Sequence, residues 1–143
     1  MQQIKVKPIT QSFILDTLPP TMNEIIAMAK PFKGKKKCSA YDLAKIEWNL
    51  IIGAIVREKK LKPFTTPVWV HIRFFVNKKL DRDNLRACQK FILDGIVKSK
   101  FIVSDGQNWV EDITYKEEKP LNGVVVIVTV SNKPIYRQVL IEY

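Results

Sequence analysis

Histidine and cysteine are scarce in this sequence of 143 residues: it has one histidine, His71, and two cysteines, Cys38 and Cys88. Zinc sites built from these residue types need several ligands at paired spacings, so we do not expect one here. The two cysteines are far apart in the chain and lack the spacing of a disulfide framework. Free thiols in a reducing compartment are therefore expected.

Long hydrophobic segments are also missing. The longest largely apolar run, Val124 to Val130, is too short to span a bilayer. The N-terminus, Met1 to Lys5, lacks the apolar stretch of a signal peptide. We therefore expect a soluble, cytoplasmic protein that does not associate with membranes.

Positive charge is in excess. The chain has 24 Lys and Arg residues against 14 Asp and Glu residues, a formal net charge of +10. This exceeds what solubility requires and favours a polyanionic partner. An anionic membrane is the alternative, but no predicted helix combines a basic face with an aromatic one. Nucleic acid is therefore the preferred class of partner.

The hydropathy pattern predicts a single α/β domain over residues 1–143, with helices packed on a mixed β-sheet. The expected order is strand (12–15), helix (21–28), helix (40–60), strand (68–76), helix (83–98), strand (109–116) and strand (123–131). The last strand is continuous in Val and Ile, which is typical of a central strand. Residues 132–143 are expected to add an edge strand or a C-terminal arm.

The second expected helix has a clear N-terminal signal. Ser39 is predicted to cap it, with Asp42 as the acid of a capping box. Apolar residues at helical spacing predict that the helix faces the core: Leu43, Ile46, Trp48, Leu50, Ile51, Ile55 and Val56.

The most informative segment contains Asp81 and Asp83, where a strand is expected to end and a helix to begin. In an extended chain, carboxylates two residues apart project to the same side and repel each other unless a cation lies between them. Oxygen ligands alone suit Mg²⁺ or Mn²⁺. The alternative is structural: Asp83 caps the helix and Asp81 is a solvated turn residue.

On a helical wheel, Lys90 and Asp94 fall within about 20° of Asp83. The opposite face carries Leu85, Cys88, Ile92 and Ile96. Lys90 is thus either part of a surface ion pair or a cation that stabilises charge developing on a phosphate.

Three segments in this order resemble the RusA family of Holliday-junction endodeoxyribonucleases: Asp81-Arg82-Asp83-Asn84-Leu85, Leu93-Asp94-Gly95, and the Ser104-Asp105 turn after Phe101-Ile102-Val103. The resemblance covers Val68 to Lys116 and extends to Leu18–Asn23. It implies a RusA-like fold and a homodimer that resolves four-way DNA junctions by paired nicking, in recombination and repair. A phage or prophage origin is also implied.

The resemblance further implies that Asp81, Asp83 and Asp105 are catalytic and bind Mg²⁺, for which Mn²⁺ can substitute, with no small-molecule cofactor. The family's lysine lies where this chain has Ala87, and Lys90 is the candidate for its role. Ser104 also replaces an acid that is often found in the family.

Two alternatives remain open: a non-catalytic DNA-binding module of this fold, and a Mg²⁺-dependent nuclease that prefers flaps or single strands. Candidate contacts to the DNA backbone are Lys33, Lys35, Lys36, Lys37, Lys78, Lys79, Arg82 and Arg86.

Overall fold

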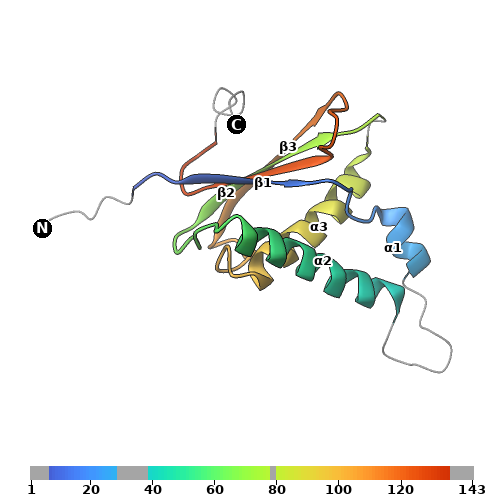
Figure 1. Cartoon of the computed structure of the whole chain (residues 1–143), viewed down its shortest axis with the longest axis horizontal. Coiled ribbons are helices and arrows are strands. Elements are labelled where there is room, and N and C mark those ends of the chain that lie inside the picture. The colour runs from blue at the N-terminus through green and yellow to red at the C-terminus, as the bar shows by residue number, and fades with distance from the viewer. Residues whose placement is uncertain (1–6, 29–38, 78–79, 136–143) are drawn as a thin grey trace, which may run out of the picture.

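A computed structural model describes residues 7–28, 39–77 and 80–135, which contain four strands and three helices in the predicted order. The elements are β1 (Thr10–Leu15), α1 (Met22–Met28), α2 (Ala40–Glu58), β2 (Val68–Phe75), α3 (Arg82–Lys98), β3 (Val110–Glu118) and β4 (Val126–Ser131). They form one small domain with a single mixed sheet, so the predicted fold class is confirmed (Figure 1).

The strand order in the sheet is β1-β4-β2-β3. β4 is antiparallel to both of its neighbours, and all six of its residues are buried. Its continuous run of Val and Ile therefore did indicate a central strand. β2 and β3 are parallel, which leaves β3 at one edge of the described sheet and β1 at the other.

The parallel pair constrains the path of the chain. Two parallel neighbours cannot be joined by a tight turn, and the connection between β2 and β3 runs through α3. The carboxyl ends of both strands therefore lie at the same end of the sheet, and α3 begins at that end.

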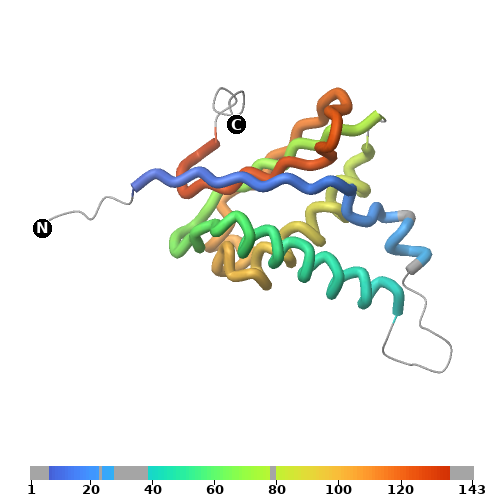
Figure 2. Tube along the Cα trace, in the orientation of Figure 1, coloured from blue at the N-terminus to red at the C-terminus, as the bar shows by residue number. Residues whose placement is uncertain are grey.

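Helices α2 and α3 lie side by side against one face of the sheet (Figures 1 and 2). The core between them and the sheet consists of side chains that are almost fully buried, among them Phe13, Ile52, Val70, Ile72, Phe74, Cys88, Ile92, Ile96 and Phe101. None of the described helices is long and apolar enough to cross a membrane.

The predicted capping box of α2 is present. The Ser39 hydroxyl accepts a hydrogen bond from the Asp42 backbone N–H at 3.3 Å, and the Asp42 carboxylate accepts one from the Ser39 N–H at 2.9 Å. Trp48 and Val56 are buried, as expected for a helix that faces the core.

Other residues of α2 contradict the prediction that its apolar positions are core. Leu43, Ile46 and Leu50 are 50%, 57% and 65% exposed. The covered side carries Trp48, Ile52 and Val56, which are spaced by four residues. Both sets fit a helical period, so periodicity identified the helix but not the face that packs on α3 and the sheet.

The free edge of β1 is partly occupied by another segment. The Gln11 side-chain amide donates to the Lys62 carbonyl and accepts from the Lys62 N–H, each at 2.8 Å. This pair of hydrogen bonds replaces part of the pairing that a neighbouring strand would supply.

Close packing between α2 and α3 depends on Gly95. A Cβ at this position would lie 3.0 Å from Ile52 Cβ and 3.1 Å from Ile52 Cγ1, and Ile52 is fully buried. We predict that Gly95→Ala lowers the free energy of unfolding by about 1–3 kcal/mol, because overpacking outweighs the gain in helix propensity. Urea denaturation measures the change.

Gly53→Ala is the matched control for this substitution. Gly53 is also inside a helix, but a Cβ there meets only the Arg57 guanidinium, at 3.5 Å. We expect this variant to be unchanged or more stable by up to about 1 kcal/mol. Equal stability of the two variants would contradict the packing argument.

Candidate functional site

The start of α3 differs in one respect from the expected arrangement of its acids. Asp81, rather than Asp83, caps the helix: its carboxylate accepts a hydrogen bond from the Asn84 N–H at 2.9 Å. Asp83 lies in the first turn and is exposed. The two carboxylates are therefore not two residues apart in extended chain, because the helix begins at Arg82.

Three hydrogen bonds from two segments distant in sequence hold this end of α3 in place. The Glu117 carboxylate accepts a hydrogen bond from the Leu80 N–H at 3.1 Å. The Asn84 side-chain oxygen accepts one from the Met22 N–H at 3.0 Å. The Cys88 thiol donates to the Pro19 carbonyl at 3.2 Å. The Pro19–Met22 segment, to which the RusA resemblance extends, is thereby attached to the helix that carries Asp81 and Asp83.

The thiol of Cys88 is suited to this role. Burial raises the pKa of Cys88 to about 12, so the group remains protonated and keeps its donor hydrogen at neutral pH. Cys88 is therefore a structural residue, as expected of an apolar helix face.

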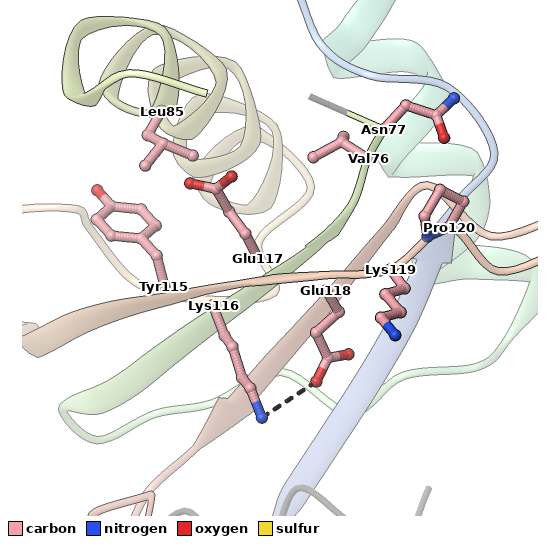
Figure 3. A pocket seen from close by; sticks show the side chains of 9 residues that line it. All are labelled: Val76, Asn77, Leu85, Tyr115, Lys116, Glu117, Glu118, Lys119 and Pro120. Carbon is pink, nitrogen blue, oxygen red and sulfur yellow. Dashed lines mark ion pairs between the residues drawn. The ribbon is translucent and has the colours of Figure 1, made fainter. Parts of the chain in front are cut away.

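A groove of about 570 Å³ runs between β3 and the start of α3. Leu85, Tyr115 and Glu117 line it, and the side chains of Tyr115 and Glu117 point toward α3 (Figure 3). Lys116 and Glu118 project from the other face of β3, where they form an ion pair at 3.3 Å (Figure 3). Glu117 is thus the acid that belongs to the α3 side of the strand.

A second groove, of about 630 Å³, lies further along α3 and shares Tyr115 with the first. Arg86 and Gln89 of α3 line it together with Asp105 and Gln107 from the turn before β3. Arg86 follows Asp83 by three residues, which is one helical turn. The structure therefore brings Asp105 to the same side of α3 as the turn that follows Asp83.

The three aspartates offer the oxygen ligands that Mg²⁺ prefers, and all three are exposed. In the part of the chain that the structure describes, however, no three His, Cys, Asp or Glu side chains form a group that could hold a metal ion. Asp81 and Asp83 flank the first residue of α3, while Asp105 stands apart from them in the second groove. The carboxylate oxygens of the three aspartates are therefore suitable ligands for a hard cation, but the three side chains do not surround a single point.

Lys90 lies where the helical wheel placed it. Lys90 and Asp83 are both exposed and Asp94 is half-buried, while Cys88, Ile92 and Ile96 are buried on the opposite side of α3. Lys90 does not line either groove. Ala87, at the position of the family's lysine, is 4% exposed and belongs to the covered side.

The candidate backbone contacts divide into two groups. Arg82 and Arg86 are exposed near the start of α3. The remaining candidates, Lys33, Lys35, Lys36, Lys37, Lys78 and Lys79, lie outside the described residues, as does most of the expected C-terminal arm.

His71 lies on the face of the sheet that is turned away from the helices, and it is 6% exposed. Its Nδ1 atom is hydrogen-bonded to the Thr114 hydroxyl. Burial lowers its pKa, and the neighbouring Arg73 guanidinium, itself paired with Glu118 at 2.7 Å, lowers it further. The ring is therefore neutral at pH 7, as expected of a structural histidine.

Sequence reasoning missed Gln89, Tyr115 and Glu117. Glu117 lies 36 residues after Asp81, and no local pattern connects them. The parallel pairing of β2 with β3 could have indicated the contact, because it places the end of β3 beside the chain that leaves β2.

No protein-family model matches this chain, and a search of curated proteins also finds no match. The RusA resemblance therefore stays a prediction from the residues that carry it.

The capping role of Asp81 can be separated from any role in chemistry. We predict that Asp81→Ala lowers the free energy of unfolding by about 1 kcal/mol, because the Asn84 N–H loses its acceptor. Asp81→Asn should keep the stability, since asparagine caps helices as well as aspartate does. Thermal denaturation of both variants measures this, and equal loss in the two would contradict a capping role.

Proposed function

We propose that this protein is a Mg²⁺-dependent endodeoxyribonuclease that cuts branched DNA, in the manner that the RusA resemblance implies. The observation that carries the proposal is that Asp81 and Asp83 lie at the start of α3, and that Arg86, one helical turn after Asp83, lines the same groove as Asp105. This end of α3 follows the carboxyl end of β2, which is where open α/β sheets commonly bind ligands. The net charge of +10 supports a polyanionic substrate.

Each residue has a proposed role. Asp81, Asp83 and Asp105 would hold Mg²⁺, with Mn²⁺ as a substitute; Asp81 accepts the capping hydrogen bond through Oδ1, which leaves Oδ2 for a ligand. Bound Mg²⁺ would supply an activated water and stabilise the leaving oxygen. Lys90 would stabilise negative charge on the phosphate, and Arg82 and Arg86 would contact the backbone of the strand.

The proposal includes a homodimer in the cytoplasm. A four-way junction has near-twofold symmetry, so paired nicking requires two related active sites. The exposed apolar residues of α2, which are Leu43, Ile46 and Leu50, would provide an apolar surface for a second copy. None of these three residues lines either groove, so a second copy bound there would leave both grooves open.

We predict that Asp83→Asn abolishes cleavage of a four-way junction but leaves binding intact or tighter. The substitution removes a metal ligand and also removes a negative charge that repels phosphate. Asp83 is exposed and makes no capping hydrogen bond, so the fold should be unaffected. Junction cleavage in Mg²⁺ and in EDTA, with binding measured in EDTA, tests this.

The same assay distinguishes the alternatives. Flap and single-stranded substrates, offered beside the junction, identify a nuclease of different preference. Wild-type protein that binds DNA and cuts no substrate in Mg²⁺ would overturn the enzymatic proposal in favour of a binding module. Full activity of Asp83→Asn would overturn the metal-site assignment.

We further predict that Lys90→Ala lowers the single-turnover cleavage rate by about 10²-fold, the scale for loss of a group that stabilises transition-state charge. Affinity and melting temperature should change little, because the side chain is exposed. Lys98→Ala is the control, since it removes an equal charge from the last turn of the same helix. If both variants lose rate to the same small extent, Lys90 acts only through the net charge of the helix.

A further inference from the structure

The groove that contains Asp105 has a lining that the proposed chemistry does not use. Beside Arg86 and Asp105 it presents two side-chain amides, Gln89 and Gln107, and the ring of Tyr115. Val110 and Ile113 supply apolar surface at the same place. Amides, an aromatic ring and aliphatic groups in one groove are typical of a site for a flat, partly apolar ligand that forms hydrogen bonds at its edge.

The charges in this groove do not favour a phosphate-binding site. Arg86 is the one basic residue in its lining, and Asp105 and Asp112 are both acidic. When no cation is bound at Asp105, a phosphate inside the groove would be repelled by two carboxylates and attracted by one guanidinium. A neutral ligand that carries N–H donors meets no such penalty and finds an acceptor in the Asp112 carboxylate.

Gln89 has an unused acceptor. Its side-chain oxygen is inaccessible to water and has no hydrogen-bond partner in the described part of the chain. Gln89 lines the groove, and the terminal torsion of glutamine is broad, so its amide can rotate there. An acceptor left unmet in the free protein favours a ligand that supplies the missing donor.

Tyr115 is placed to contact the face of a ring. On one side it packs against Phe74, with centroids 6.4 Å apart and an interplanar angle of 35°. Its side chain also lines both grooves, so the ring is accessible from the α3 side of β3. Burial raises the pKa of the Tyr115 hydroxyl, and the charge of the nearby Arg86 lowers it by less.

From these contacts we propose that the groove between α3 and β3 binds a nucleobase of a DNA strand whose backbone runs past the start of α3. Tyr115 contacts the face of the base, and Gln89 forms hydrogen bonds to its edge. The inference rests on the proposed function in taking DNA as the ligand, and it adds a site that distinguishes a base from its backbone. An unpaired or splayed nucleotide fits this site, because a base inside a duplex does not expose its face.

The test compares two labelled single strands of equal length and charge, one with bases and one with abasic residues throughout. Binding is measured by fluorescence anisotropy in EDTA, at one fixed salt concentration because phosphate contacts depend on salt. Wild-type protein should bind the base-bearing strand about tenfold more tightly, the scale of stacking on one aromatic side chain. Gln89→Met and Tyr115→Leu should each bring this ratio toward one.

Arg82→Ala is the control for backbone contacts. Arg82 is exposed one turn before Arg86 and does not line the groove, so its loss should weaken binding of both strands equally. A ratio of one in the wild-type protein would overturn the proposal without reference to any variant. So would an unchanged tenfold ratio in Gln89→Met, which preserves the length of the side chain.

The outcome is separable from that of the nuclease proposal. If the protein prefers base-bearing strands but cuts no junction in Mg²⁺, the base site is supported and the nuclease proposal is overturned. If the protein cuts junctions but binds abasic and base-bearing strands equally well, the nuclease proposal is supported and the base site is overturned.

Discussion

The parallel pairing of β2 with β3 is the constraint on which the rest of the structure depends. It forces the chain to cross the sheet between the two strands, and α3 is that crossing. As a result, α3 begins at the carboxyl ends of the strands, where the Glu117 carboxylate accepts a hydrogen bond from the Leu80 N–H. Every candidate residue for chemistry is the residue that caps α3, lies on α3, or lies on the turn after it.

The elements of this fold could be predicted well from the sequence because their signals are local. The capping box at Ser39 and the Val- and Ile-rich β4 each depend on residues within one element. What could not be predicted was which of two apolar sides of α2 would be covered. That choice depends on the helix that packs beside it, and Gly95 of α3 allows Ile52 to approach closely.

The candidate site could be predicted only in part. The acids at residues 81 and 83 were recognised, but Asp81 is the capping residue because the helix begins at Arg82, two residues before the start that a cap at Asp83 would give. The grooves could not be predicted, because they are formed by two elements that approach each other in space. Tyr115 is an ordinary strand residue in the sequence, and only its place opposite α3 brings it into the lining of both grooves.

The position of β3 at the edge of the described sheet has a consequence for how copies of the protein behave in concentrated solution. An open edge invites another chain to add a strand, which is a common start of aggregation. β3 carries charged side chains at five of its nine positions, namely Glu111, Asp112, Lys116, Glu117 and Glu118. A strand added against it would have to desolvate several of these charges, so the edge that leaves the grooves open to a ligand is also protected against uncontrolled pairing.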